Sequence, residues 1–295
     1  MEKTVIAVLG GDKRMDFAAR ELVRLGYDVR EWGRCESDDA AKFSKIAKEW
    51  LSDVDALMLP LPTSFDGTHL CAPLCQGEEK LRMETLFLAA PEKLWFVGRF
   101  GEALRLRADR ERIRWIDYFD SEILQLKNAL PTAEGAIEIA MRELPVVLND
   151  TKVSVIGYGR IGEVLSQKLK ALGADVTVWA RRREVCARAE LLGHSTKLIA
   201  GENSLDFDTN TRVIFNTVPS PLFTRTVLQT IGHACIIIDL ASAPGGVDMT
   251  AAAELGIHSI WATALPGKCA PESAGIILGQ TVHSILLDAP WRSDF

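Results

Sequence analysis

Short runs of apolar, often β-branched residues alternate along the whole chain with longer stretches whose apolar positions recur at helical spacing. The runs have the length of strands buried on both faces, and the longer stretches are typical of the helices that cover such a sheet. Turn residues end several runs, as Gly10 and Gly11 do after the first run and Pro60 after the third. The alternation therefore predicts repeated strand–helix–strand units, which build a mostly parallel sheet.

The predicted elements fall into two series. In the first series the predicted strands are residues 5–9, 28–32, 54–59, 94–97 and 114–118, and the predicted helices are residues 17–25, 40–51 and 81–88. In the second series the predicted strands are residues 153–156, 175–179, 212–215, 235–239 and 258–261, and the predicted helices are residues 161–172, 184–192, 251–255 and 274–287. We expect an α/β protein with two Rossmann-like, doubly wound parallel-sheet domains and a cleft between them.

The two series predict the domain boundaries. Residues 1–130 are expected to form a Rossmann-like or flavodoxin-like substrate domain, and residues 151–270 a Rossmann domain that binds a dinucleotide. Pro131 and Thr132 open the helical stretch between them, so residues 131–150 are expected to be a connecting helix. The last helix, within residues 271–295, is expected to return to the first domain. Two domains also fit a length of 295 residues.

Composition narrows the classes of protein. Hydrophobic residues make up 47% of the chain and charged residues 25%, as in an ordinary globular protein. The chain has 34 basic against 40 acidic side chains and no basic block, so we expect no nucleic-acid partner, although a local basic pocket remains compatible with this balance. No apolar run reaches 18 residues, the first residues do not resemble a signal peptide, and six cysteines are too few for a disulfide framework. We therefore expect a cytoplasmic protein that does not enter a membrane.

A glycine fingerprint stands at the start of the second series. The stretch Gly157-Tyr158-Gly159-Arg160-Ile161-Gly162 directly follows a predicted strand and opens a predicted helix. Its first glycine permits a tight turn, the second lets the backbone approach a pyrophosphate, and the third lets helix and strand pack closely. The helix N-terminus then offers free N–H groups to the phosphates. This pattern predicts a dinucleotide site, and the alternative is a glycine turn that only packs a strand against a helix.

The end of the next strand distinguishes NAD from NADP. An NAD site usually has an acid there, whose carboxylate binds the ribose 2′-hydroxyl. Here Ala180 stands at the strand end, and Arg181, Arg182 and Arg183 follow it. Guanidinium groups suit a 2′-phosphate through charge-assisted hydrogen bonds, so the predicted cofactor is NADP. The alternative is a solvated basic start of the next helix, which still leaves the acid of an NAD site missing.

Two later loops leave the carboxyl ends of predicted strands, where ligands of open α/β sheets bind. The first consists of Asn216, Thr217, Val218 and Pro219, and the second begins at Asp239. We expect both loops to border the cofactor. The alternatives are an ordinary turn residue for Asn216 and a strand-end cap for Asp239.

Three loops of the first half carry groups suited to an anionic small molecule. Lys13 and Arg14 follow a glycine turn, Thr63 and Ser64 follow the third strand, and Arg99 follows the fourth. A glycine turn at a helix N-terminus with basic neighbours suits a carboxylate. Taken singly, each basic residue is more typical of a surface charge. Together they predict a site for an acidic metabolite.

Other chemistry-bearing residues give weaker signals. Lys268 stands in the loop before the last helix, where it is either a ligand-binding residue or a solvated lysine. Cys269 has no histidine nearby in sequence, so we do not expect it to be a nucleophile. His69, Cys71 and Cys75 are close together but lack a second ligand pair at zinc spacing, so no metal site is expected. No histidine stands out as a catalytic base.

Six motifs occur in one order along the chain. They are Gly10-Gly11-Asp12-x-Arg14, Asn128-x-x-Pro131-Thr132-x-Glu134-Gly135, Gly157-x-Gly159-Arg160-x-Gly162, Asn216-Thr217-x-Pro219, Asp239-Leu240-Ala241-Ser242-x-Pro244-Gly245-Gly246 and Leu265-Pro266-Gly267-x-x-Ala270-Pro271-x-x-Ala274-Gly275. This combination closely resembles the family of dipicolinate synthase A subunits over almost the whole chain.

The resemblance implies an NADP-dependent, dehydrogenase-like protein that works with a flavoprotein, the B subunit of dipicolinate synthase. During sporulation it would oxidise a dihydrodipicolinate-type intermediate of the lysine (diaminopimelate) pathway, with hydride transfer to NADP. The small dicarboxylate substrate needs cationic or hydroxyl partners, and a base or water must take a ring proton. The candidate substrate-binding residues are Arg14, Thr63, Ser64, Arg99 and Lys268, and the candidate catalytic residues are Asp239, Glu134 and Lys268.

The second half also resembles the cofactor domains of alanine dehydrogenase and of 2-hydroxyacid dehydrogenases. Alanine dehydrogenases often carry an acid at the position of Ala243, so this departure weighs against their mechanism. Two alternatives stay open: an NADP-dependent 2-hydroxy or 2-amino acid dehydrogenase, and a non-catalytic dinucleotide-binding partner of a flavoprotein. We also expect a homo-oligomer.

Overall fold

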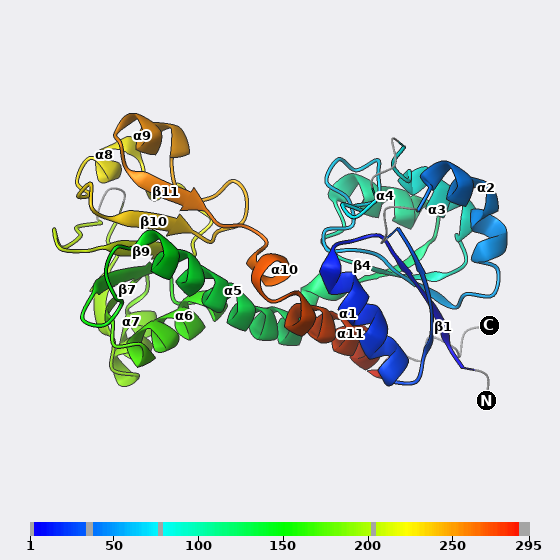
Figure 1. Cartoon of the computed structure of the whole chain (residues 1–295), viewed down its shortest axis with the longest axis horizontal. Coiled ribbons are helices and arrows are strands. Elements are labelled where there is room, and N and C mark those ends of the chain that lie inside the picture. The colour runs from blue at the N-terminus through cyan, green and yellow to red at the C-terminus, as the bar shows by residue number, and fades with distance from the viewer. Residues whose placement is uncertain (1–2, 34–37, 76–78, 202–204, 289–295) are drawn as a thin grey trace. The chain divides into compact units, whose positions relative to one another are not determined.

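The computed structural model describes residues 3–33, 38–75, 79–201 and 205–288 (Figure 1). The chain divides into two compact units. Unit 1 contains residues 1–127 and 270–295, and unit 2 contains residues 128–269. Each unit is an α/β domain built on a parallel sheet, as the alternating runs predict. The first boundary between the units falls within helix α5 (Glu122–Glu143), and the second falls between α10 (Leu265–Cys269) and α11 (Pro271–Asp288).

The sheet of unit 1 has the strand order β2-β1-β3-β4-β5. Its strands are β1 (Val5–Leu9), β2 (Asp28–Trp32), β3 (Ala56–Met58), β4 (Leu94–Val97) and β5 (Arg114–Asp117), and the short helix η1 (Tyr118–Asp120) follows β5. Helices α1 (Lys13–Arg24) and α11 cover one face, and α2 (Ala40–Trp50), α3 (Met83–Ala89) and α4 (Glu102–Arg110) cover the other. This is the flavodoxin-like order, in which the direction of winding changes between β1 and β3. A ligand site is therefore expected at the loops after these two strands.

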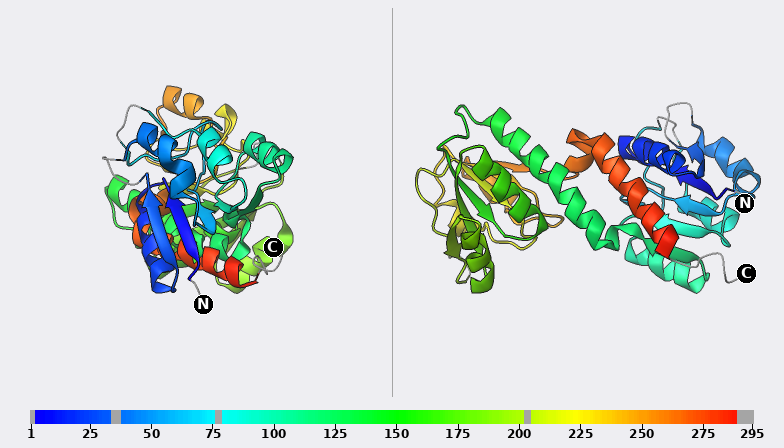
Figure 2. Two further views of the ribbon diagram at one scale, coloured as in Figure 1. Left: turned by 90° about the vertical axis from the view of Figure 1, so that its right-hand side faces the viewer. Right: turned by 90° about the horizontal axis from the view of Figure 1, so that it is seen from below.

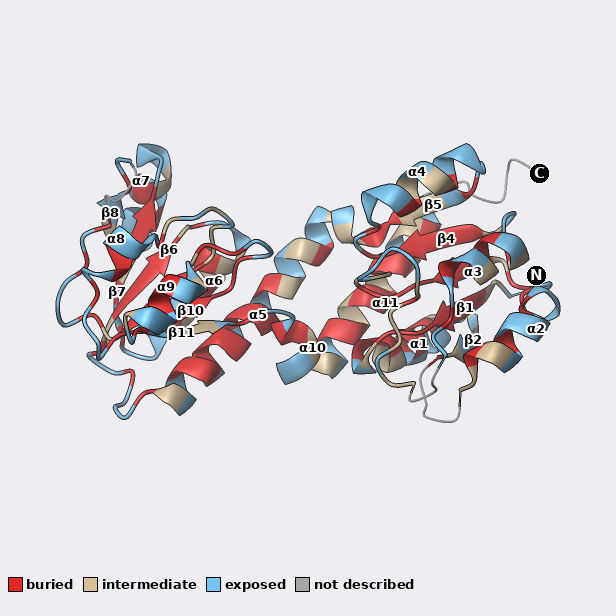
Figure 3. Ribbon diagram, turned by 90° about the horizontal axis from the view of Figure 1, so that it is seen from above, coloured by how far each residue is buried: buried red, intermediate tan, exposed pale blue. Residues whose placement is uncertain are grey.

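Alternation along β1 explains the two cores of unit 1. Successive side chains of a strand point to opposite faces of the sheet. Ala7 and Leu9 therefore pack with α2, α3 and α4, whereas Ile6 and Val8 pack with α1 and α11. All four side chains are fully buried. Figure 3 shows the same division: β1 and β4 are largely buried, and the helices expose the face turned away from the sheet.

Helix α11 lies along α1 within unit 1 (Figure 2). Two glycines one turn apart on α11 allow the backbones to approach closely. A Cβ at Gly275 would lie 2.3 Å from the backbone oxygen of Arg14, and a Cβ at Gly279 would lie 2.9 Å from that of Ala18. The last helix is thus part of the first domain's core, although it follows the whole of unit 2 in sequence.

Replacing Gly275 by valine is expected to destabilise the protein by about 1–3 kcal/mol, the usual effect of overpacking a closed contact. The added atoms would meet the Arg14 backbone oxygen and the Phe17 Cβ, which lies 2.6 Å from the Cβ position. Chemical denaturation followed by circular dichroism should show a lower midpoint. Gly101→Ala is the matched control, because open space surrounds Gly101 and its φ is −61°. A valine variant as stable as the parent would contradict the close packing of α1 and α11.

Unit 2 has a six-stranded sheet with the order β11-β10-β9-β6-β7-β8. Its strands are β6 (Lys152–Ile156), β7 (Asp175–Ala180), β8 (Ser195–Leu198), β9 (Val213–Asn216), β10 (Ile236–Asp239) and β11 (His258–Trp261). Residues of α5, α6 (Arg160–Ala171) and α7 (Arg183–Leu191) pack on one face, and α8 (Arg225–Leu228) and α9 (Met249–Glu254) pack on the other. This is the Rossmann strand order, whose direction of winding changes between β6 and β9.

Most predicted elements are confirmed, and β1, β2, β4 and β11 have the predicted bounds. The structure adds α4, α8, α10 and β8, which the pattern did not predict. β8 is an edge strand that is largely exposed on both faces, so it lacks the apolar alternation of a half-buried strand. None of the helices within the described ranges is both long and apolar enough to cross a membrane.

The predicted bounds of the connecting helix, residues 131–150, are wrong at both ends. Helix α5 spans Glu122–Glu143 and holds Pro131 in its interior. Ser121 begins it, because the Ser121 hydroxyl accepts a backbone N–H of the first turn (3.3 Å). Thr132 does not cap a helix; its hydroxyl donates to the Asn128 carbonyl one turn back (2.7 Å). Proline is typical of a first turn but is tolerated inside a long helix whose packing compensates for the lost hydrogen bond.

Candidate functional site

The glycine turn of unit 2 lies at the change of winding between β6 and β9. Gly157 has a φ of +92°, and its N–H donates to the Trp179 carbonyl (2.8 Å). A Cβ at Gly157 would lie 2.4 Å from the Thr217 hydroxyl, and one at Gly162 would lie 2.1 Å from the Gly157 oxygen. A Cβ at Gly159, by contrast, would have no atom within 4 Å. The first and third glycines are therefore needed for packing, and the second faces open space, as a dinucleotide turn requires.

A cavity of about 450 Å³ lies at this turn. The glycine turn, the end of β7 with the residues after it, and the loop after β9 provide its lining. The lining residues are Gly157, Tyr158, Gly159, Trp179, Ala180, Arg181, Arg182, Val185, Ile199, Val218 and Leu222. Its volume is in the range of small-molecule sites.

The charges around this cavity are those of an anion site. Arg181, Arg182 and Arg183 are exposed, and their guanidinium groups form no ion pair with any residue in the described part of the chain. Ala180 is buried at the end of β7 and brings no carboxylate. Helix α6 begins at Arg160, and no side chain caps its N-terminus, which leaves its first N–H groups available to a phosphate. The predicted Ile161 packs partly buried against the hydrophobic core.

The loop after β9 is braced from within. Asn216 is buried and its Nδ2 donates to the Val218 carbonyl (3.0 Å), while the Thr217 hydroxyl donates to the Ile156 carbonyl (2.9 Å). Val218 lines the cavity, but Pro219 is exposed and is absent from its lining. Of the four residues predicted here, the structure places Val218 against the cavity and assigns Asn216 and Thr217 to shaping the loop.

Asp239 holds the neighbouring loop. Its carboxylate is buried and accepts from Asn216 Nδ2 (2.8 Å), the Ala241 N–H (3.1 Å) and the Gly246 N–H (2.8 Å). The Trp261 indole N–H donates to the Ala241 carbonyl (2.9 Å) and fastens the same loop to the end of β11. A carboxylate with three buried donors fits the role of a brace better than the predicted role of a base that meets substrate.

The other two predicted catalytic residues are exposed. Glu134 pairs with Lys168 (2.8 Å) near the C-terminal end of α6, about 12 Å along the helix from its first residue. Glu134 is therefore placed away from the glycine turn. Lys268 lies in α10 and forms no ion pair with any residue that the structure describes. Cys269 beside it donates its S–H to the Leu265 carbonyl (2.8 Å), which suits a helix contact.

In unit 1, Arg14 lies at the change of winding between β1 and β3. Its guanidinium pairs with Asp12 through Nε and Nη2 (2.9–3.1 Å), and Nη2 also donates to the Leu61 carbonyl (2.6 Å). Asp12 caps α1, so this pair ties the helix start to the loop after β3. Nη1 has no hydrogen bond within the described ranges. Arg14 is mostly committed to the fold and keeps one donor group for a ligand.

The structure does not support Thr63 as a substrate-binding residue. Its side chain is completely buried; its hydroxyl contacts the Pro60 carbonyl (3.1 Å) and accepts the Gly98 N–H (3.0 Å). Thr63 therefore fastens the loops after β3 and β4 to each other. Ser64 is half-buried, and its hydroxyl accepts the Gly67 N–H (2.9 Å), which closes a turn. The two hydroxyls that looked alike in sequence are both used by the loop itself.

Arg99 is held at the carboxyl edge of the sheet in an unusual conformation. Its φ is +49°, a value that non-glycine residues rarely adopt. The Asp117 carboxylate fixes it by accepting the N–H groups of Arg99 (3.1 Å) and Phe100 (2.8 Å). The exposed guanidinium lies over the Phe119 ring, 4.7 Å from its centre. Such outliers cluster at ligand sites, so Arg99 remains a candidate substrate-binding residue.

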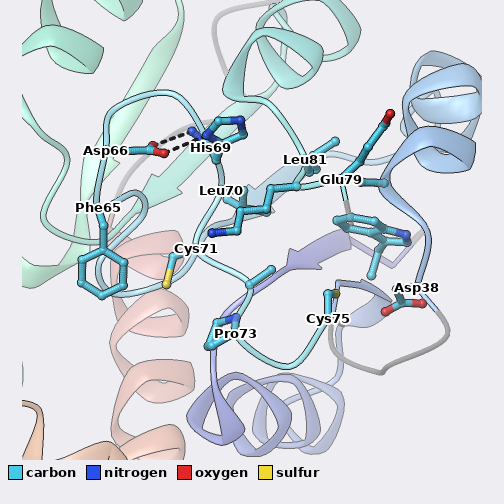
Figure 4. Close-up of a pocket in the computed structure, with 14 residues that line it drawn as sticks. Asp38, Phe65, Asp66, His69, Leu70, Cys71, Pro73, Cys75, Glu79 and Leu81 are labelled. Atoms are coloured by element: carbon cyan, nitrogen blue, oxygen red, sulfur yellow. Dashed lines mark hydrogen bonds and ion pairs between the residues drawn. The ribbon is translucent and has the colours of Figure 1, made fainter. Parts of the chain in front are cut away.

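Sequence reasoning missed a second cavity, of about 400 Å³, in unit 1 (Figure 4). It includes Asp66 and His69, whose carboxylate Oδ2 and ring Nδ1 lie 2.7 Å apart. The signal that could have found them is an acid three residues before a histidine in a polar loop that follows a strand. No group of three or more His, Cys, Asp or Glu within the described ranges has the arrangement of a metal site. The lining residues are Trp32, Asp38, Ala40, Phe65, Asp66, His69, Leu70, Cys71, Ala72, Pro73, Cys75, Glu79, Lys80 and Leu81.

Comparison with known proteins confirms the resemblance to dipicolinate synthase A subunits that the six motifs indicate. Residues 5–119 match the family model of the N-terminal domain of the dipicolinate synthase A subunit. The chain is 29% identical to the dipicolinate synthase A subunit of Bacillus subtilis (strain 168) over 290 residues, which is 96% of each chain. The crystal structure of the dipicolinate synthase A subunit from Bacillus halodurans matches with a TM-score of 0.85 and 26% identity, over 97% of this chain and 98% of that one. The chain is similar to these A subunits over nearly its whole length.

More distant structures share the fold. A D-lactate dehydrogenase from Treponema pallidum matches with a TM-score of 0.61 and 12% identity, over 97% of this chain and 98% of that one. The fold of the chain is therefore that of a two-domain dehydrogenase, with a Rossmann-type sheet in unit 2.

Proposed function

We propose that this chain, a relative of the dipicolinate synthase A subunit, is an NADP-dependent oxidoreductase that forms dipicolinate. It oxidises a dihydrodipicolinate-type intermediate of the lysine (diaminopimelate) pathway in the cytoplasm during sporulation. It works as a homo-oligomer with a flavoprotein, the B subunit of dipicolinate synthase. The observation that supports this proposal is the cavity of unit 2. Its lining includes the first two glycines of the fingerprint, Ala180, and two arginines that form no ion pair in the described ranges.

The proposed cofactor fits the residues of unit 2. The N–H groups at the start of α6 would bind the pyrophosphate, and Arg181 and Arg182 would bind the 2′-phosphate. A strict preference for NAD is disfavoured because Ala180 stands where an NAD site has its acid. When bound, the nicotinamide supplies the hydride acceptor. Internal hydrogen bonds hold the loops after β9 and β10 in a fixed conformation at the carboxyl edge of the sheet. The protein needs such a fixed edge to position the cofactor and the substrate.

The proposed substrate is a small dicarboxylate, and unit 1 offers the groups to bind it. Arg14 Nη1 is available at the change of winding, and the Arg99 guanidinium is presented at the same edge of the sheet. Lys268 remains a proposed cationic partner. Loss of a hydride and a proton makes the ring aromatic, and this supplies driving force, so binding and orientation of the substrate are the main tasks of the chain.

The direct test is turnover by the purified full chain. With NADP⁺ and freshly made dihydrodipicolinate precursor, we expect NADPH absorbance and dipicolinate absorbance to rise together. Turnover only after addition of the flavoprotein would favour a non-catalytic dinucleotide-binding role. Oxidation of lactate or alanine in place of the precursor would favour a 2-hydroxy or 2-amino acid dehydrogenase.

Replacing Arg99 by alanine is expected to raise the KM for the dicarboxylate about tenfold, the usual loss for one charge-assisted hydrogen bond. Steady-state kinetics at saturating NADP⁺ measures this. Arg110→Ala is the control, because Arg110 is exposed at the C-terminal end of α4, away from the carboxyl edge of the sheet. An unchanged KM in Arg99→Ala would mean that the unusual backbone conformation of Arg99 serves the fold and not substrate binding.

A further inference from the structure

The loop after β3 contains a fixed carboxylate–imidazole pair. Asp66 Oδ1 accepts the backbone N–H groups of Thr68 and His69, both at 2.8 Å, and lies 3.2 Å from the Ser64 hydroxyl. Its second oxygen, Oδ2, lies 2.7 Å from His69 Nδ1. Four contacts hold one carboxylate, so the orientation of the imidazole is set by the backbone of the same turn. This distinguishes the pair from two surface side chains that meet by chance.

The pair determines which ring nitrogen carries the proton. The His69 side chain and the backbone N–H groups of His69 and Thr68 hold the pKa of the Asp66 carboxyl well below its usual range. An ionised carboxylate can only accept a hydrogen bond, so Nδ1 is the donor to Asp66, and the Thr68 hydroxyl, 2.8 Å from Nδ1, lies where it can accept from the same N–H. In the neutral ring Nε2 then carries a lone pair, and it has no hydrogen bond to any residue that the structure describes. This is the arrangement of an oriented proton acceptor.

The pair belongs to a cavity at the carboxyl edge of the sheet of unit 1. His69 and Asp66 line the 400 Å³ cavity together with Phe65, whose side chain is 83% exposed (Figure 4). Cys71 lines it too, and its carbonyl accepts the N–H of Gly11 in the turn after β1 (2.7 Å). The cavity therefore adjoins the carboxyl edge of β1, where ligands of such sheets bind. Its volume is in the range of small-molecule sites.

The other charged residues around the cavity are of both signs. Lys80 lines it and offers a cation to a substrate carboxylate. Asp38 also lines it, but its carboxylate accepts the Gly33 N–H (2.8 Å) and is in use by the fold. Asp66 is occupied by its own turn and by His69. Glu79 is exposed.

We propose that His69 Nε2 is the general base of the oxidation put forward above, with Asp66 as its positioning residue. This inference rests on the proposed function. One ring C–H bond of the dihydropyridine breaks and its hydrogen leaves with both electrons, for which NADP⁺ bound in unit 2 would supply the acceptor. A second ring hydrogen leaves as a proton to Nε2, and the electrons of its bond form the new ring double bond. The imidazolium stays paired with the Asp66 carboxylate and passes its proton to water.

The first test replaces His69 by asparagine, whose amide can still donate to Asp66 but has no basic nitrogen. We expect kcat to fall by about 10²–10⁴-fold, as for loss of a general base, with the KM and the Kd for NADP⁺ nearly unchanged. Imidazole in the buffer should restore part of kcat in this variant and not in the parent. The control is the same substitution at His233, which is exposed in unit 2. A His69→Asn variant that turns over at the parent's rate would overturn the inference while the proposed function stands.

The second test does not depend on turnover. The chain has five histidines, so long-range ¹⁵N correlation spectra of the full chain can resolve them, and His69→Asn identifies the His69 signals. We expect Nδ1 to be the protonated nitrogen, and we expect dipicolinate to shift the Nε2 resonance. A protonated Nε2, or no shift with dipicolinate, would overturn the inference whatever the kinetics show. If dipicolinate shifts the Nε2 resonance but the chain turns over neither alone nor with the flavoprotein, the cavity stays the dicarboxylate site, and both the proposed reaction and the role of His69 as its base are rejected.

Discussion

Replacing Arg181 by aspartate is expected to raise the Kd for NADP⁺ about 100-fold and to change the Kd for NAD⁺ by less than about threefold. Arg181 lines the cavity beside Ala180, and its guanidinium forms no ion pair with any described residue, so it is available to a 2′-phosphate. A charge-assisted hydrogen bond is worth about 1.5–3 kcal/mol, and the new carboxylate adds repulsion. NAD⁺ lacks the phosphate and loses neither term.

Calorimetric titration of the full chain with each dinucleotide measures both constants. Arg183→Asp is the matched control, because it makes the same change of charge two residues away at a side chain that does not line the cavity. We expect that control to weaken NADP⁺ only slightly, and less at high salt, since it acts through screened long-range attraction. Equal losses for NADP⁺ and NAD⁺ in Arg181→Asp would remove the 2′-phosphate role.

The parts of the site that were predictable from sequence depend on local geometry. Gly157, Gly159 and Gly162 lie within six residues, and their spacing alone sets a turn between a strand and a helix. In the structure, neighbouring atoms enclose Gly157 and Gly162, whereas Gly159 faces open space. The central strands of both sheets were also predictable from sequence, because a strand buried on both faces is an uninterrupted apolar run, whereas the exposed edge strand β8 was not.

The sequence predictions that failed concern residues whose partners lie far away along the chain. Thr63 looked like a ligand hydroxyl, but its partner Gly98 is 35 residues away, and no local pattern reveals that contact. Arg14 is similar, since it donates to the carbonyl of Leu61, 47 residues later. Pro131 misled for another reason: a proline inside a helix and one at its start look alike in sequence, and the Ser121 cap was overlooked. The pair of Asp66 and His69, by contrast, is local and could have been found.

Replacing Asp239 by alanine is expected to destabilise the protein by about 3 kcal/mol or more, because three buried donors lose their shared acceptor. The donors are Asn216 Nδ2 and the N–H groups of Ala241 and Gly246, which lie 2.8–3.1 Å from the carboxylate. Chemical denaturation should show a much lower midpoint. Glu134→Ala is the companion variant: its exposed carboxylate has one ion pair, with Lys168, so we expect little change in stability or in turnover.

The two variants distinguish a structural role of Asp239 from a role as the catalytic base. If Asp239 shapes the cofactor loop, its loss lowers turnover by depleting and loosening the folded protein, and saturating NADP⁺ should restore part of both stability and activity by binding the native state. If Asp239 were the proton acceptor, the variant would bind NADP⁺ normally, and NADP⁺ would restore no turnover. An Asp239→Ala variant that is as stable as the parent but inactive would therefore indicate that Asp239, and not His69, is the proton acceptor.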